Sequence, residues 1–365
     1  MKILENDKKY RVLSDDKVKL SNQLRAKTYE VKVDTSGFYL EEIDNLSLGN
    51  GKIYGDSESK VDMITRAYEA SDRSLGIILA GKKGIGKTLF AKILANKAVD
   101  KGYPVILVNK GYQGISKFID SIKQEVVILF DEFEKNFNNL SVDEQDTNTS
   151  TESQSSLLNL FDGISSQKRL YVITVNKLYN LNEYMLNRPG RFHYLIRLEF
   201  PKPEDITEYL HDKLDEKYYD EIPEILKFGY RVPLNYDSLR AISFELNLGT
   251  PFKEAISNLN IINIEDRYYR LQLVFSNGYV DKEDAIKMNL FSEVVNINDN
   301  GFEMTFNTKD LNANSHVMEI PGDKVTFKAY EGNKIYQHTH AGTSNSNLVK
   351  VAIEPISQKD IGFSL

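Results

Sequence analysis

The 365-residue sequence contains no cysteine and no tryptophan, and it has only five histidines. Without cysteine the chain has neither a disulfide framework nor a cysteine-ligated zinc site. The zinc-protease motif His-Glu-x-x-His is also missing, which excludes a fused protease of that class. The composition is compatible with a reducing compartment.

Long apolar runs and an excess of positive charge are absent as well. No apolar stretch approaches the roughly 20 residues that cross a bilayer. The first residues, MKILENDKKY, lack the apolar centre of a signal peptide. We therefore expect a cytoplasmic protein without membrane contact. The net charge of -7 disfavours nucleic acid as a partner, because a nucleic-acid surface needs excess lysine and arginine.

Five short apolar runs follow one another in the first part of the chain. They are nearly continuous and mostly rich in β-branched residues, which is typical of strands covered on both faces. Helical patterns fall between them, and this alternation indicates a parallel sheet with helices on both faces. The runs begin at Gly76, Pro104, Val126, Tyr171 and Tyr194.

Changes in sequence texture divide the chain into four parts. Residues 1–50 carry short alternating runs and predict an N-terminal β-containing segment. Residues 51–201 hold the five-stranded α/β core. Helical patterns over 202–264 predict a small helical lid. Runs separated by Asn, Gly and Asp turns predict a β-rich C-terminal domain over 265–365.

Two shorter stretches carry local predictions. Residues 141–156, SVDEQDTNTSTESQSS, contain a single apolar residue and predict a mobile loop. His338 and His340 alternate in a run that we interpret as a strand, so both imidazoles would share one face. Because no acidic cluster is near, this pair favours a plain exposed strand over a metal site.

A phosphate-binding motif follows the first apolar run. Its glycines allow backbone N–H groups to turn toward phosphates, and the next helix points its positive end at them. Lys87 is expected to reach the β- and γ-phosphates, and the Thr88 hydroxyl to ligate Mg²⁺. The strand before the motif and the amphipathic helix after it argue against a chance match. The nucleotide-binding set comprises Gly81, Lys82, Lys83, Gly84, Ile85, Gly86, Lys87, Thr88 and the adjacent Leu89.

Two carboxylates end the run that begins at Val126. Asp131 is expected to hold Mg²⁺, directly or through water, and Glu132 to polarise the attacking water as catalytic base. An acidic strand end has a plain structural explanation when it stands alone, but the phosphate loop upstream favours catalysis. A glutamate at this position argues against a protein that only binds nucleotide. The sequence therefore predicts an ATPase that uses ATP and Mg²⁺.

These motifs resemble the AAA branch of the AAA+ family, and the resemblance extends from Ile53 to Leu259. Asn176 ends the run that starts at Tyr171, as the family's sensor-1 residue does. The string from Asn187 to Phe192, NRPGRF, is similar to the family's arginine-finger segment.

The resemblance implies catalytic roles for residues of these two segments. Asn176 would help to place the lytic water, and Arg188 and Arg191 would enter the ATP site of a neighbouring subunit, where a guanidinium neutralises charge on the transferring phosphoryl group. Surface ion pairs are the structural alternative for the two arginines.

Further roles follow from the same resemblance. Ile53, Tyr54 and Gly55 stand where family members hold the adenine with backbone and an apolar side chain. Tyr112, in the string KGYQG, is a candidate pore-loop aromatic that grips a polypeptide; an ordinary turn aromatic is an equal alternative. The segment 109–125 is shorter than in family members that thread proteins.

Arginine fingers that act in trans require self-assembly, and the resemblance implies a homo-oligomeric ring, usually of six subunits. Our first hypothesis is an AAA+ ring ATPase that remodels, unfolds or disassembles a protein or protein complex, with an unidentified protein substrate. The alternative is a nucleotide-switched assembly factor or scaffold whose C-terminal β domain binds the partner. The short segment 109–125 favours this alternative, and the acidic balance disfavours a DNA-directed motor.

Overall fold

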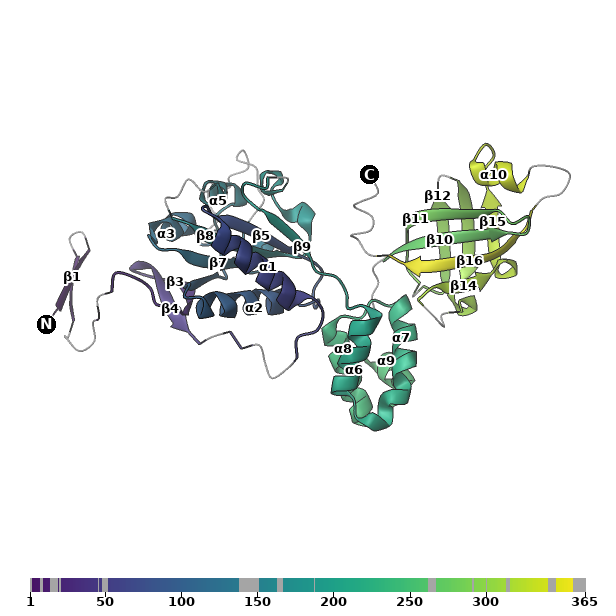
Figure 1. Cartoon of the computed structure of the whole chain (residues 1–365), viewed down its shortest axis with the longest axis horizontal. Helices are drawn as coiled ribbons and strands as arrows, with labels where there is room; N and C mark the ends of the chain where they lie inside the picture. Colours follow the sequence, from purple (N-terminus) through teal and green to yellow (C-terminus); the bar gives the residue numbers. More distant parts are fainter. Residues whose placement is uncertain are drawn as a thin grey trace. The chain divides into compact units, whose positions relative to one another are not determined.

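Figure 1 shows the chain as a computed structural model, in which the residues fall into two compact units, Met1–Leu198 and Glu199–Leu365. None of the helices in the described parts combines the length and the apolar character that crossing a bilayer takes. The structure describes residues 2–6, 9–13, 19, 21–44, 46–47, 52–137, 151–162, 167–186, 188–261, 267–290, 292–299, 301–312, 316–340 and 346–356.

A seven-stranded sheet forms the centre of the first unit. The five runs expected from the sequence are its five strands β6, β7, β8, β5 and β9, which pair in parallel. The predicted parallel α/β sheet is therefore confirmed, with two strands more than the five expected. In sheet order the strands are β4 (Gly37–Ile43), β3 (Thr28–Asp34), β6 (Val105–Val108), β7 (Val126–Phe130), β8 (Arg169–Val175), β5 (Leu75–Ala80) and β9 (Tyr194–Arg197).

The two additional strands come from the N-terminal segment. β3 pairs in parallel with β6, and β4 returns beside β3 as an antiparallel edge strand. This hairpin is thus an extension of the central sheet. Strands β1 (Lys2–Asn6) and β2 (Lys9–Leu13) form a separate antiparallel pair.

Alternating residues of the central strands enter two hydrophobic cores, one on each face of the sheet. In β5, Ile77 and Leu79 belong to one core, and Ile78 and Ala80 to the other. Because both faces are covered, the strands read as continuous apolar runs. The helices α1 (Ser57–Ala70) and α2 (Lys87–Asp100) cover one face (Figure 1). The other core takes in α3 (Ile115–Ser121), α4 (Phe133–Asn136) and α5 (Gln154–Phe161).

The second unit begins with helices and continues with strands. Two antiparallel sheets, ordered β11-β10-β16-β14 and β12-β13-β15, enclose a third core. The predicted β-rich C-terminal region is therefore confirmed. The helices are α6 (Pro203–Lys213), α7 (Ile222–Arg231), α8 (Tyr236–Asn247) and α9 (Phe252–Asn258). The strands are β10 (Arg267–Phe275), β11 (Val280–Met288), β12 (Val294–Asp299), β13 (Phe302–Asn307), β14 (Met318–Pro321), β15 (Val325–Ala329) and β16 (Leu348–Pro355).

The strand expected at His338 and His340 is wrong. His338 lies in helix α10 (Lys334–Thr339), and His340 is the residue that ends it. The Asn333 side chain caps this helix by accepting a hydrogen bond from the backbone N–H of Ile335, and such a cap favours a helix at the start of a polar run.

The predicted mobile loop over 141–156 is wrong at its C-terminal end. Thr151 forms a β-bridge with Tyr112, and the Ser153 side chain caps α5 by accepting from the Ser156 backbone. Serines and threonines that looked like loop composition are therefore used as a bridge and a helix cap. Residues 141–150 lie outside the described part of the chain.

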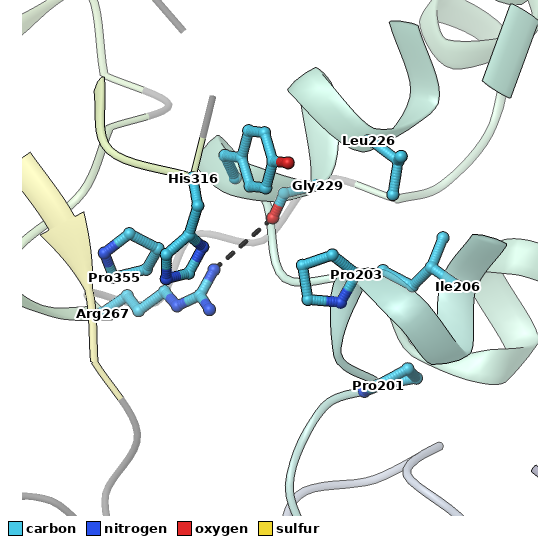
Figure 2. A pocket seen from close by; sticks show the side chains of 9 residues that line it. Pro201, Pro203, Ile206, Leu226, Gly229, Arg267, His316 and Pro355 are labelled. Atoms are coloured by element: carbon cyan, nitrogen blue, oxygen red, sulfur yellow. Dashed lines mark hydrogen bonds between the residues drawn. The ribbon is translucent and has the colours of Figure 1, made fainter. Parts of the chain in front are cut away.

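The last turn of α7 contacts the first residue of β10. Arg267 Nη1 donates to the backbone carbonyl of Gly229 at 3.5 Å, and burial lowers the pKa of this guanidinium. Figure 2 shows the contact at the edge of a small pocket that Pro203 and His316 also line. A cation is favourable here because the last carbonyls of a helix lack partners within the helix.

One carboxylate is buried in the β-rich region. Asp281 is 2% exposed; its Oδ1 accepts from the Tyr279 hydroxyl at 2.9 Å and pairs with Lys334 at 2.7 Å. Its Oδ2 has no hydrogen-bond partner among the described residues. Glu283 follows two residues later on the same face of β11. Burial, and then hydrogen bonding to Asp281, raises the pKa of Glu283 to about 7. Burial and the hydrogen bond to Asp281 therefore favour the protonated form of Glu283.

We expect this carboxyl pair to make stability depend on pH between 4.5 and about 7, the ordinary and the raised pKa of Glu283. Because the folded chain holds the proton more tightly, the stabilisation is complete below the lower value and is lost as pH rises through the higher one. Glu283→Gln keeps an N–H donor for Asp281 at every pH. The variant should exceed wild type by on the order of 1 kcal/mol at pH 8, and the difference should vanish at pH 5. Urea unfolding followed by circular dichroism measures this, and parallel pH profiles of the two proteins would contradict it.

Candidate functional site

The phosphate-loop motif connects β5 to helix α2 by a tight turn. Gly84 and Gly86 have φ angles of 76° and 96°, a region in which a side chain is strained. Gly81 packs so closely on Ile85 that a Cβ atom there would lie 2.2 Å from Ile85 Cδ1. Ile85 is itself buried. The loop is therefore anchored by one apolar side chain, and its glycines leave room in front of the helix.

Lys87, the first residue of α2, is surrounded by oxygen atoms. Its Nζ donates to the carbonyls of Gly81 at 2.6 Å and Lys82 at 2.7 Å, and to Asn176 Oδ1 at 2.9 Å. These three acceptors are neutral. Among the described residues, the ammonium group at the end of β5 is therefore held by these neutral acceptors and has no direct counter-ion.

The electrostatic environment of Lys87 suits an anion. Burial lowers the pKa of this lysine, and the negative charges of Glu134, Asp131 and Glu132 oppose that effect. A partly desolvated ammonium that faces neutral acceptors interacts strongly with a phosphate, because Coulomb attraction grows as the dielectric falls. The lysine and the glycine turn together therefore fit a nucleotide phosphate chain. Thr88 is exposed in the first turn of the same helix.

Thr174 connects the acidic pair to the neighbouring strand. Its hydroxyl donates to Asp131 Oδ1 at 2.6 Å and accepts from the backbone N–H of Glu132 at 2.9 Å. Glu132 has φ 47° and ψ 47°, an uncommon conformation for a residue with a side chain. Its exposed carboxylate pairs with Lys135. The two carboxylates therefore face different surroundings, one fixed by a hydroxyl and the other open to solvent.

Asn176 follows β8 and is held from two sides. Its backbone N–H and its Nδ2 each donate to Glu134 Oε1 at 2.7 Å, while its Oδ1 accepts from Lys87. The other oxygen of that carboxylate, Oε2, is buried and has no partner in the described residues. Lys87, Asn176 and Glu134 thus form a continuous chain of hydrogen bonds across the carboxyl ends of β5, β8 and β7.

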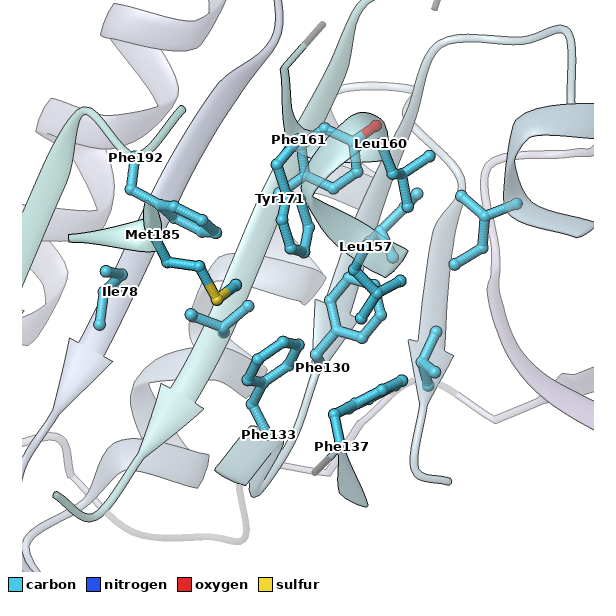
Figure 3. Close-up of a cluster of buried hydrophobic side chains, with 14 of the residues drawn as sticks. Ile78, Phe130, Phe133, Phe137, Leu157, Leu160, Phe161, Tyr171, Met185 and Phe192 are labelled. Atoms are coloured by element: carbon cyan, nitrogen blue, oxygen red, sulfur yellow. The ribbon is translucent and has the colours of Figure 1, made fainter. Parts of the chain in front are cut away.

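Aromatic side chains on one face of the sheet pack against these segments. Phe130 and Phe133, on either side of the acidic pair, are fully buried and pack edge to face with ring centroids 5.7 Å apart. Phe161 of α5 packs at 5.0 Å against Phe192, which follows the predicted arginine fingers. Figure 3 shows all four rings in one cluster on one face of the sheet. One core therefore supports both the acidic pair and the arginine segment.

The two predicted arginine fingers have different environments. Arg188 is exposed. Arg191 is only 9% exposed; its Nε and Nη2 pair with the Asp162 carboxylate, and its Nη1 donates to the Tyr184 carbonyl at 2.7 Å. The hydrogen bond from Arg191 lowers the pKa of Asp162. The guanidinium of Arg191 is therefore bound to residues of its own chain. Of the two arginines, Arg188 is the one that faces solvent.

The arginine segment and the phosphate loop lie at opposite edges of the sheet. The His193 backbone donates to the Gly76 carbonyl at 2.8 Å, and a Cβ atom on Gly76 would lie 2.1 Å from the Arg191 carbonyl oxygen. Gly76 is near the start of β5, whereas Gly81 follows its end. At about 3.3 Å per residue, about 16 Å separate the two glycines. Because the backbone of Arg191 donates to the carbonyl of Arg188 at 2.9 Å, both arginines belong to the far edge.

The predicted adenine segment packs on the core beside α1. Ile53 and Leu89 contact the same hydrophobic cluster. Tyr54 is buried, and Gly55 has φ 76° in an exposed turn. The base contact of this segment stays a prediction.

Tyr112 is half-buried and tied to the segment before α5. Its ring meets Phe38 edge to face at 6.3 Å, and its backbone forms the bridge with Thr151. The Glu152 backbone donates to the Gly111 carbonyl at 2.7 Å. The backbone of the KGYQG string is therefore held by residues 151 and 152. A polypeptide-gripping role for Tyr112 stays a prediction.

Three residues that organise the site were missed in the sequence. Thr174 is a polar residue in an otherwise apolar run, Glu134 is a third carboxylate after the acidic pair, and Asp162 follows helix α5. Each carried a visible signal, namely a polar residue at the edge of a buried element. Nothing in the local pattern names the partner, because the partners lie 29 to 43 positions away in sequence.

Comparisons with known proteins agree with this geometry. Residues 77–200 match the sequence model of the family described as "ATPase family associated with various cellular activities (AAA)". An ATPase family AAA domain-containing protein of Arabidopsis thaliana is 31% identical over 147 residues, which are 37% of this chain and 12% of that protein.

Two bacterial relatives have informative names. An "AAA ATPase forming ring-shaped complexes" of Bifidobacterium adolescentis is 28% identical over 162 residues, 38% of this chain and 32% of the relative. A "Proteasome-associated ATPase" of Streptomyces scabiei is 25% identical over 240 residues, 57% of this chain and 37% of the relative. The chain thus spans less than two fifths of the length of each of these relatives.

The different environments of the two arginines predict different effects on stability. Asp162→Ala should destabilise the first unit by about 3 kcal/mol, because it leaves the buried guanidinium of Arg191 unpaired. Adding Arg191→Met should restore part of the loss. Arg188→Ala, the matched change at the exposed position, should cost less than about 0.5 kcal/mol. Urea unfolding of the four proteins measures these values. Equal effects of Asp162→Ala and Arg188→Ala would contradict the buried ion pair.

Proposed function

Because this chain belongs to the AAA family of ATPases, we propose that it hydrolyses ATP in a homo-oligomeric ring and thereby remodels, unfolds or disassembles a protein or protein complex. One observation carries the proposal. Lys87, Asp131, Glu132 and Asn176 converge at one edge of the sheet, whereas the exposed Arg188 belongs to the opposite edge. A complete site therefore takes two copies of the chain.

The residues at the first edge have the chemistry for phosphoryl transfer to water. ATP supplies the phosphoryl group, and Mg²⁺ neutralises charge on its oxygens. Lys87 exchanges its neutral acceptors for phosphate oxygens. Thr88 and Asp131 supply oxygen ligands of the kind that Mg²⁺ prefers.

Glu132 is the residue that would act as general base. Its carboxylate is exposed, and its backbone N–H is fixed by Thr174, so the strand end sets where the base stands. Asn176 contributes a side-chain N–H that Glu134 leaves unused, because an amide nitrogen carries two hydrogens. A base and an amide donor on adjacent strand ends can hold one water molecule between them.

The surface around Arg188 supports self-assembly. Tyr179 is 74% exposed and Tyr184 is 54% exposed, and both precede Arg188 in the same connection from β8 to β9. Tyrosine and arginine are enriched in the centres of protein interfaces. The ring-forming name of the Bifidobacterium relative supports the same conclusion. A six-membered ring is part of this proposal.

A nucleotide-switched scaffold is the second candidate function. It is favoured by the anchoring of Tyr112, because a half-buried ring and a bridged backbone suit a fixed turn. In that case ATP turnover times assembly, and the β-rich region of the second unit binds the partner. The name of the proteasome-associated relative favours the first candidate.

Arg188→Ala should abolish ATP hydrolysis without changing nucleotide affinity. If the arginine acts in the neighbouring site, its loss should lower kcat by about 10³-fold. Mixing Arg188→Ala with Glu132→Gln, each of which should be inactive by itself, should restore part of the activity, because mixed rings then contain sites that combine an intact Glu132 with the Arg188 of the neighbouring subunit. Arg66→Ala, which removes an exposed arginine of α1, is the matched control. Normal hydrolysis by Arg188→Ala alone, or no restored activity at any mixing ratio, would refute the shared site.

Tyr112 distinguishes the two candidate functions. If the chain pulls on polypeptides, Tyr112→Ala should abolish unfolding of a bound protein substrate and keep basal ATP hydrolysis within about threefold, while Tyr112→Phe retains both because the ring supplies the contact. Unfolding is followed by loss of fluorescence from a fused fluorescent protein. Unchanged unfolding by Tyr112→Ala would favour the scaffold.

A further inference from the structure

Glu134 lies on α4, two residues after the proposed general base, and its hydrogen bonds connect it to Asn176. We propose that Glu134 is a positioning residue that fixes the side-chain amide of Asn176 for phosphoryl transfer. The inference rests on the proposed ATPase function and adds a residue to it. Glu134 acts through Asn176, and it is distinct from both carboxylates of the acidic pair.

The donors and acceptors around Asn176 allow only one orientation of its amide. Lys87 can only donate, so the amide oxygen must face the lysine; an ionised Glu134 can only accept, so the amide nitrogen must face the glutamate. The observed distances of 2.9 Å and 2.7 Å match this orientation. The identity of the two neighbours therefore removes the flip that an asparagine side chain otherwise permits.

One oxygen of Glu134 bears both hydrogen bonds. The backbone N–H and the Nδ2 of Asn176 converge on Oε1, each at 2.7 Å. Two hydrogen bonds from one residue to one atom fix the side chain relative to its own backbone. The end of β8 thereby determines the direction of the second Nδ2 hydrogen, which Glu134 leaves unused.

Lys87 releases Asn176 when the lysine turns to a phosphate, because its contact with Oδ1 competes with that anion. Among the described residues, Glu134 is then the side chain that still holds the amide. Glu134 is also the strongest favourable charge on the Lys87 ammonium, as it is the largest of the three carboxylate effects that raise its pKa. The same carboxylate therefore serves the lysine before binding and the asparagine after it.

The second oxygen of Glu134 points to a donor that comes with the bound state. Oε2 is buried and has no partner among the described residues. An unsatisfied buried carboxylate oxygen is costly, and such atoms in folded proteins are usually explained by water or by function. Water ordered beside the phosphate chain is the donor that this position fits.

The test compares three replacements of Glu134 with one control. Glu134→Gln keeps a carbonyl oxygen for both hydrogen bonds and loses only the charge. Glu134→Met fills the volume but accepts no hydrogen bond, and Glu134→Ala removes the side chain. Glu41→Ala removes an exposed carboxylate of β4 and is the matched control. Each protein is assayed for kcat and KM for ATP, and for the affinities of fluorescent ATPγS and ADP.

We expect Glu134→Ala and Glu134→Met to lower kcat by about 30-fold and to raise KM by about fivefold, since the amide meets the third phosphate in the bound state and acts more strongly in the transition state. Glu134→Gln should stay within about threefold of wild type. In an Asn176→Ala background, neither Glu134→Ala nor Glu134→Met should lower kcat further. Full activity of Glu134→Met, equal loss in Glu134→Gln, or losses that add to Asn176→Ala would overturn the proposal.

Nucleotide affinities separate this inference from the proposed function. If wild type binds ATPγS but hydrolyses no ATP, the proposed ATPase activity fails. Glu134→Met should still reduce the preference for ATPγS over ADP by about fivefold, because the positioned amide meets only the third phosphate. An unchanged preference would overturn the role of Glu134 by itself.

Discussion

A half-buried ammonium must find oxygen acceptors, and the arrangement at the carboxyl edge of the sheet follows from how Lys87 finds them. Two acceptors come from its own loop and the third from Asn176, at the end of the neighbouring strand. That third contact joins the loop to β8. Glu134 then joins β8 to β7 through the same asparagine. Three strand ends are thereby connected by polar contacts, and the aromatic cluster on one face of the sheet packs against the same segments.

Sequence predictions succeeded for elements whose pattern depends only on residues within one short segment. The strands of the central sheet were found because burial on both faces makes each run apolar regardless of its neighbours. The phosphate loop and the acidic pair could be proposed from the sequence because their chemistry depends on adjacent residues. The number of strands in the central sheet was underestimated. The apolar and polar residues of β3 and β4 alternate, and the pairing of β3 with β6 depends on a distant part of the chain.

The residues that escaped prediction act across long sequence separations or break a local pattern. The role of Asp162 is to pair with Arg191, and the role of Thr174 is to hold the acidic pair; neither contact can be inferred from the residues next to them in sequence. In the second unit, β11 carries no continuous alternating apolar run, because Asp281 and Glu283 occupy inward positions that such a pattern reserves for hydrophobic residues. Ala285, with φ 62°, then shifts the register, so the inward series resumes at Ile286.

The close approach at Gly76 has a consequence for how neighbouring subunits would communicate in the proposed ring. Strand β5 begins beside the arginine segment and ends at the phosphate loop, so in a ring each copy of β5 extends between two consecutive catalytic centres. A fully buried strand resists stretching, and one inserted or deleted residue would reverse which core each side chain enters. A displacement at one nucleotide would therefore travel about 16 Å along a rigid backbone to the guanidinium that serves the next nucleotide. The timing of hydrolysis around the ring would then depend on the length of a single strand.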